Sequence, residues 1–493
     1  MANGQRNRIL LVHGWSADYR SFLPMQGWLT SQGFDPQTVY FGQYDSMEDH
    51  VTFDDMAVGM HARIQELADN GQISLAPFSL DAVVHSTGGP AIRHWLNYYL
   101  RNICKGDFSK CPLKRLIMLA PANFGSRLAQ QGESALAKIF MGGLSHGFET
   151  GKHVLEGLEL GSPTLWKIAG QDLFSGTKFY PVDPDKGPFV FVFSGTDTFG
   201  KLKGLVASGA NEDGSDGTVR ASAASLNSIL IQSEFITNPA RSTTSVTIQR
   251  NAPIAFRLVK GRNHATIVSE GGEVDSEVAV LIQRCLQVND GKGYEALRTA
   301  FDAETKQIHE AEAGNGVHAF QQVIFRVKDQ MGNAVLDYRL DFHVVDDTIR
   351  SSSWGEGSEG VLDQLRKYID ETNFLQDRVI AHVQKHSVDP SYRTFFINID
   401  ALQELRAMMQ KKDPKCYIGM NLDALGRTRN LTYETDKIRY INVSSPLGNM
   451  NGQTIDFFEP NTSTLVDITL KSTPNDRVVI VWKSSEKNKF PSW

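Results

Sequence analysis

The sequence has no long hydrophobic run, few cysteines and no excess of positive charge. The apolar run that begins at Arg8 is too short for a signal peptide or a membrane span. We therefore expect a cytoplasmic product without a cleavable leader, whose export would need a leaderless route. Four cysteines are too few for a disulfide scaffold in 493 residues. Cys104 and Cys111 are spaced to close one small loop under oxidising conditions, and whether they do so is left open.

The formal net charge is -6, with acidic and basic residues mixed along the chain. No basic stripe is available to neutralise a phosphate backbone, so nucleic acid is not an expected partner. Hydrophobic residues make up 41% of the chain, which is enough to fill two or three cores at this length. We expect a globular protein of at least two domains.

Residues 1–290 alternate short apolar runs with helical patterns. This order is typical of a mostly parallel, doubly wound α/β sheet with helices on both faces. Met56, Met60 and Ile64 recur at helical spacing, as do Ile92 and Trp95, and we expect these stripes to be core. The strands are expected at Arg8 to Val12, Thr38 to Phe41, Ala82 to His85, Leu116 to Ala120, Phe189 to Ser194 and Ile254 to Val259.

Residues 128–180 form an apolar insertion between two of these strands, where either a cap or lid or plain packing would fit. A helical connector is expected over residues 291–315. Residues 316–493 then show alternating apolar and polar positions, as in Leu336 to Val344. This pattern predicts an all-β, sandwich-like domain of unknown role.

One turn carries the strongest chemical signal. In the run Asp81 to Pro90, an apolar strand ends at His85, Ser86 stands at the apex, and Gly88-Gly89 open a helix. A serine becomes a nucleophile when a sharp turn holds its oxygen outward, with room for a base and for N–H donors. Val84 stands where the usual G-x-S-x-G elbow has glycine, and an ordinary junction with an N-capping serine is the alternative.

The serine needs a base and an orienting acid. His264 follows the sixth expected strand and is the candidate base. Asp216, in the turn Asp216-Gly217-Thr218-Val219, is the favoured acid because that turn is tight, and Asp197, after the fifth strand, is the alternative. His85 is expected on strand geometry that faces away and His94 on the following helix, both with structural roles.

An acyl-transfer site also needs two N–H donors for the oxyanion. Thr87, directly after the serine, would supply one. Trp15, in Val12-His13-Gly14-Trp15 after the first strand, would supply the other. We expect no cofactor and no obligatory metal, since the acidic residues near Asp216 lack the alternating oxygen ligands of a calcium loop.

Together the motifs H-G-W, H-S-T-G-G, A-P-A-N-F-G-S (Ala120 to Ser126), S-D-G-T-V and N-H resemble the α/β-hydrolase lipases over residues 1–290. The resemblance is strongest to lipase and phospholipid acyl-hydrolase branches with a D-G-T-V acid turn. It implies an esterase with Ser86, Asp216 and His264 as its triad and Trp15 and Thr87 as oxyanion donors. Residues 316–493 match no family that we can name.

The leading hypothesis is a serine hydrolase of carboxylic esters, a lipase or phospholipid acyl hydrolase acting through an acyl-enzyme. Its partner would be a lipid or small-molecule ester, and contact with a membrane or lipid interface is compatible with such a substrate. One alternative keeps the triad in a thioesterase or acyltransferase. Another assigns the function to the C-terminal domain as a binding module.

Overall fold

The structure of the protein is a computed structural model. It describes residues 8–13, 22–39, 50–130, 152–176, 179–199, 212–238, 241–351, 359–426, 431–435, 438–450 and 453–474.

A six-stranded parallel sheet forms the N-terminal part, in the order β2-β1-β3-β4-β5-β8. Apart from the edge strand β2, its strands are mostly apolar because the sheet is covered on both faces. All six predicted strands are confirmed with end points shifted by a few residues, and residues 40–41 of the second predicted strand lie outside the described residues. They are β1 (Arg8–Val12), β2 (Asp35–Val39), β3 (Leu80–His85), β4 (Leu113–Leu119), β5 (Phe189–Gly195) and β8 (Ala255–Val259).

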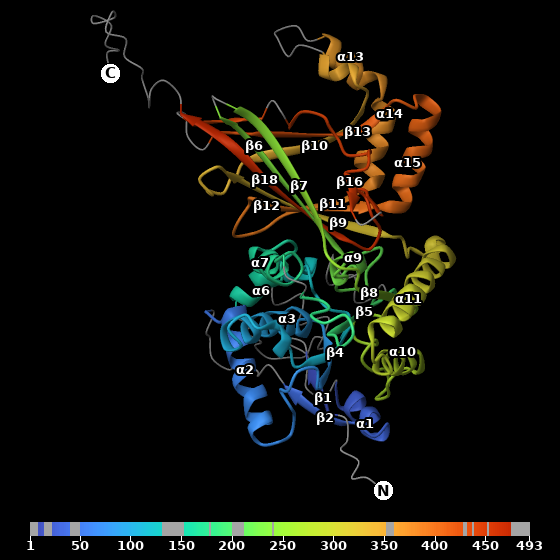
Figure 1. Ribbon diagram of the computed structural model, residues 1–493. Helices are drawn as coiled ribbons and strands as arrows, with labels where there is room; N and C mark the ends of the chain where they lie inside the picture. Colours follow the sequence, from blue (N-terminus) through green and yellow to red (C-terminus); the bar gives the residue numbers. More distant parts are fainter. Residues whose placement is uncertain are drawn as a thin grey trace, which may run out of the picture.

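Helices pack on the two faces of this sheet, which confirms the doubly wound arrangement (Figure 1). One buried cluster joins one face to α2 (Phe53–Asp69) and α3 (Gly88–Tyr98), and includes the predicted stripe residues Met60 and Trp95. A second cluster joins the opposite face to α1 (Leu23–Ser31), α10 (Ser276–Leu286) and α11 (Gly291–Glu312).

The helix α11 occupies the predicted connector and is packed firmly against the parallel sheet. Tyr294 donates its hydroxyl hydrogen to the Val190 carbonyl at 2.9 Å and accepts from the Ala255 amide at 3.1 Å. The ring of Phe301 lies 5.5 Å from that of Phe193. The segment is therefore part of the N-terminal core.

A mixed sheet above the parallel one has the order β11-β12-β9-β18-β6-β7, with β14 paired to β18 (Figure 1). Its central strand β18 runs parallel to both β6 and β9. The strands are β6 (Ser228–Asn238), β7 (Arg241–Arg250), β9 (Phe320–Asp329), β11 (Ile380–Lys385), β12 (Tyr392–Asn398), β14 (Leu431–Glu434) and β18 (Ser463–Pro474).

The hairpin β6–β7 lies inside the segment that the sequence pattern assigned to the N-terminal domain, yet it pairs with C-terminal strands. The chain thus leaves the parallel sheet after β5, adds two strands to the upper sheet and returns at β8. The domain limits at 290 and 315 stay a prediction, and the two halves share this sheet.

The rest of the C-terminal region has further antiparallel pairs, which agree with the predicted β character, and also helices. The strands are β10 (Tyr338–Val345), β13 (Tyr417–Ala424), β15 (Ile441–Asn442), β16 (Gly448–Met450) and β17 (Gln453–Ile455). The helices are α12 (Thr348–Ser351), α13 (Glu359–Lys367), α14 (Ile369–Phe374) and α15 (Ile399–Lys412). Leu402, Leu405 and Met409 of α15 are buried at helical spacing, so the region is not purely β.

In the insertion, residues 131–151 and 177–178 lie outside the described residues. Its described helices α4 (Arg127–Gln130), α6 (Lys152–Leu158) and α7 (Pro163–Asp172) contribute buried side chains to the cluster that contains α3. This burial favours the interpretation that those helices are part of the core, and a lid stays a prediction. Cys104 and Cys111 are free thiols. Among the helices that the structure describes, none is both long and apolar enough to cross a membrane.

Candidate active site

Ser86 stands on a strained turn between β3 and α3. Its φ angle is 55°, in the left-handed region that residues other than glycine rarely adopt. The turn is held by the Ser86 amide, which donates to the Leu119 carbonyl at 3.1 Å, and by the Ala122 amide, which donates to the Ser86 carbonyl at 3.2 Å. The serine oxygen is thereby fixed at the end of the strand, as a nucleophile requires.

The two glycines after the serine are required by close packing. A Cβ atom at Gly88 would lie 2.7 Å from the Val12 carbonyl oxygen, and one at Gly89 would lie 2.5 Å from the Pro121 Cβ. The first turn of α3 therefore rests directly on the ends of β1 and β4. Val84, which departs from the usual elbow, is a buried residue of β3 itself.

His264 connects the serine to a carboxylate. Its Nε2 lies 2.9 Å from Ser86 Oγ, and its Nδ1 lies 2.9 Å from Asp216 Oδ2. Both His264 and Asp216 are fully buried. Because an ionised carboxylate only accepts hydrogen bonds, Nδ1 carries the hydrogen and Nε2 is left to accept from the serine hydroxyl.

Asp216 is held by its own turn. Its Oδ1 accepts from the Thr218 and Val219 amides at 2.9 and 2.8 Å, and the His264 amide donates to its main-chain carbonyl at 2.9 Å. Asp197, the alternative acid, is exposed and caps the Thr198 amide at 2.9 Å. Of the two candidates, Asp216 is the one that contacts His264.

His85 does not face away from the site, contrary to the sequence interpretation. Its Nε2–H donates to the His264 carbonyl at 2.9 Å, and the two ring centroids are 4.9 Å apart. Burial holds the pKa of His85 well below its usual value of 6.5. A neutral His85 thus supports the main chain of His264. His94 lies on α3, where its Nε2 is 2.6 Å from Asp54 Oδ1.

Of the two expected oxyanion donors, the structure describes one. Thr87 is buried and is the N-cap of α3, directly after the serine. Trp15, with Gly14, lies outside the described residues. His13, the last described residue after β1, is buried. Both oxyanion roles stay predictions.

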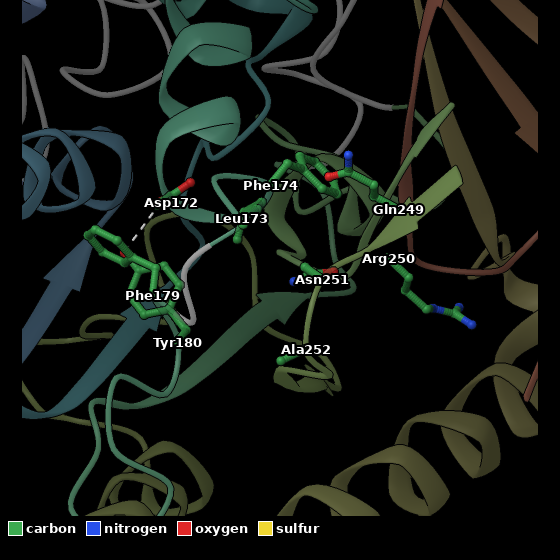
Figure 2. A pocket seen from close by; sticks show the side chains of 10 residues that line it. Asp172, Leu173, Phe174, Phe179, Tyr180, Gln249, Arg250, Asn251 and Ala252 are labelled. Atoms are coloured by element: carbon green, nitrogen blue, oxygen red, sulfur yellow. Dashed lines mark hydrogen bonds between the residues drawn. The ribbon is translucent and has the colours of Figure 1, made fainter. Parts of the chain in front are cut away.

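A pocket of about 280 Å³ lies between the end of α7 and the end of β7, and the triad residues are not among its lining (Figure 2). Phe174 and Phe179 contribute apolar walls. At its edge the buried Asp172 accepts from Tyr180 Oη at 3.3 Å and is paired with Arg93, whose Nε and Nη2 lie 2.7 and 3.0 Å from its oxygens. This buried pair joins α7 to α3, the helix that follows Ser86.

The fold is that of an α/β-hydrolase of the lipase and phospholipase kind. Among solved structures, the chain is similar to phospholipase PlaB from Legionella pneumophila, with a TM-score of 0.73 and 25% sequence identity. The likeness covers 98% of this chain and 97% of that one, and the same values hold for PlaB in complex with thio-NAD. The mature form of the Bacillus licheniformis lipase BlEst2 matches with a TM-score of 0.35 and 14% identity, over 57% of this chain and 92% of that one.

No protein-family model and no curated protein sequence matches the chain. The structural likeness to PlaB supports a hydrolase of ester bonds.

Proposed function

We propose that the protein is a serine hydrolase that cleaves the acyl ester bonds of lipids, as a phospholipase or triacylglycerol lipase. The observation that carries the proposal is the unbroken chain of hydrogen bonds from Ser86 through His264 to Asp216, with the serine on a strained turn. The phospholipase likeness over nearly the whole chain supports the lipid substrate.

In the first half of the proposed reaction, Ser86 Oγ attacks the ester carbonyl carbon while its proton moves to His264 Nε2. Asp216 stabilises the imidazolium that forms. The tetrahedral oxyanion accepts from the Thr87 amide and from the proposed second donor, the Trp15 amide. The intermediate collapses, the alcohol leaves with the proton from His264, and the acyl group stays on Ser86.

In the second half, a water molecule gives a proton to His264 Nε2 and attacks the acyl carbon. The second tetrahedral intermediate releases the carboxylic acid, and Ser86 recovers its proton from His264. No cofactor is needed for either half, because acid–base transfer and oxyanion stabilisation account for every bond change.

The test combines covalent labelling with substrate profiling. We expect a fluorophosphonate probe to label the wild type and not Ser86→Ala, whose ester turnover should fall by about 10³-fold or more. The control is Ser194→Ala, because Ser194 is also buried but lies within strand β5.

Substrates should include p-nitrophenyl esters of increasing chain length, phosphatidylcholine vesicles and a triacylglycerol emulsion. Turnover that rises with chain length supports the lipid assignment. Equal labelling of Ser86→Ala would overturn the nucleophile assignment, and activity confined to acetate esters or faster on thioesters would overturn the lipid ester as substrate.

A further inference from the structure

The turn that carries Asp216 is covered by strands from residues 316–493, which we call the C-terminal half of the protein. We call residues 212–220 the acid turn. Figure 1 shows α9 (Ala221–Ala224), which follows it directly, between the parallel sheet and β9 of the upper sheet, and α9 contacts both β5 and β9. The acid turn therefore lies where the two halves of the chain meet.

Arg220 is the last residue of the acid turn, and two aromatic rings of the C-terminal half lie against its guanidinium group. Its guanidinium carbon lies 4.5 Å from the ring centroid of Phe320 in β9 and 4.3 Å from that of Phe396 in β12. Arg220 also pairs with Ser215 in a β-bridge, and its Nε donates to the Asp213 carbonyl at 3.2 Å. The stacked guanidinium thus joins both ends of the turn to strands β9 and β12.

A second set of contacts holds the start of the turn. Asp213 Oδ2 lies 2.5 Å from His318 Nδ1, and its Oδ1 accepts from the His318 amide at 3.2 Å. Gly214 has a φ of 70°, and a Cβ atom there would lie 2.4 Å from the Phe320 ring. The Gly214 amide also donates to the Gly316 carbonyl at 3.4 Å. Residues just before and within β9 thus hold the backbone two and three positions before Asp216.

We propose that the C-terminal half positions the acid of the triad, with His318, Phe320 and Phe396 as positioning residues that act through the acid turn. This inference rests on the proposed function. A triad works only when its groups are held within about 0.5 Å of the productive geometry. The acid turn also sets the base, because the His264 amide donates to the Asp216 carbonyl. Loosening the turn therefore misplaces two triad members together.

Ordinary packing between the halves would give a different result from positioning. Packing alone would change the stability of the whole chain. Positioning through Asp216 would change kcat with little change in KM, and would lose most of its effect once the Asp216 carboxylate is gone.

The main variant is His318→Ala, because His318 is partly exposed and its loss leaves the buried core intact. We expect kcat on a p-nitrophenyl ester, and the rate of fluorophosphonate labelling, to fall about tenfold with KM within about twofold. His318→Asn should recover most of the rate, since its amide can donate where Nδ1 does. Phe396→Leu should lower kcat similarly. The control is Ser387→Ala, whose hydroxyl joins the same two halves through Glu159 at 2.6 Å rather than through the acid turn.

Each variant is repeated in an Asp216→Ala background, using the residual labelling rate. The proposal requires that His318→Ala and Phe396→Leu have a clearly smaller effect there, because only the bond from the His264 amide to the carbonyl of residue 216 is left to transmit it. An equal loss in both backgrounds, or unchanged kcat in the single variants, would overturn it. Failure of the proposed function itself is separate, because it would appear as a Ser86→Ala protein that still reacts with the probe.

Discussion

The neutral, buried state of His85 predicts both a pH dependence of stability and a loss of activity. His85→Phe removes the titrating group and the donor to the His264 carbonyl, while His85→Gln removes only the titrating group and offers an amide donor in its place. A buried carbonyl left without its donor costs about 1–3 kcal/mol. We expect His85→Phe to lose this much free energy of unfolding at pH 8, and His85→Gln to lose less.

The pH effect follows from the lowered pKa of His85. Below pH 6.5 the unfolded chain protonates this histidine while the folded chain does not, so the unfolded state binds more protons and the free energy of unfolding decreases as pH falls. Above pH 6.5 neutral His85 makes its full contribution to the free energy of unfolding. Below that value this contribution decreases by about 1.4 kcal/mol per pH unit, until the folded-state pKa is reached.

Urea unfolding followed by tryptophan fluorescence between pH 5.5 and pH 8 measures both effects, since the chain has 7 tryptophans. Both variants should show a shallower decrease below pH 6.5 than the wild type. A slope in His85→Phe equal to that of the wild type would refute the reasoning, because it would mean that His85 is protonated in the fold. In the ester assay, kcat should fall in His85→Phe and be partly retained in His85→Gln.

Three further predictions concern the acid, the ion pair and the turn. Asp216→Asn should lower kcat by about 10⁴-fold because it favours the wrong tautomer of the proposed base, as the same change does in serine proteases. Asp197→Asn should leave kcat within about twofold, and steady-state ester hydrolysis compares the two variants. Asp172→Leu should lower the free energy of unfolding in urea by about 3–5 kcal/mol, because the buried charge of Arg93 loses its partner. Adding Arg93→Met should recover part of that loss, and additive losses in the double variant would contradict the pairing. Gly89→Ala should lower both stability and labelling rate, since the new methyl group meets the proline after β4 at 2.5 Å; unchanged labelling would show that the turn can relax.

Local patterns in the sequence were sufficient for the parallel sheet and the serine turn. Apart from the edge strand β2, the strands of the parallel sheet are mostly apolar and buried on both faces, so their composition distinguishes them from the helices between them. The sharp turn at Ser86 could be predicted from the serine and the two glycines that follow it, although the atoms for which these glycines leave room belong to Val12 and Pro121, far away in the sequence. The structure confirms these strands and helices, and the roles of the site residues stay proposals.

Only the tertiary structure decided which residues meet across long separations. Asp216 and Asp197 both follow β5, and the choice between them depends on where the loop after β8 places His264. The same holds for His85, whose partner lies 179 residues away, and for the hairpin β6–β7. A strand's period of two shows which side chains share a face and carries no information on which sheet the strand joins. The acid turn is the extreme case, since its Asp-Gly-Thr-Val sequence determines a tight turn while the rings that hold Arg220 come from strands more than 95 residues further along the chain.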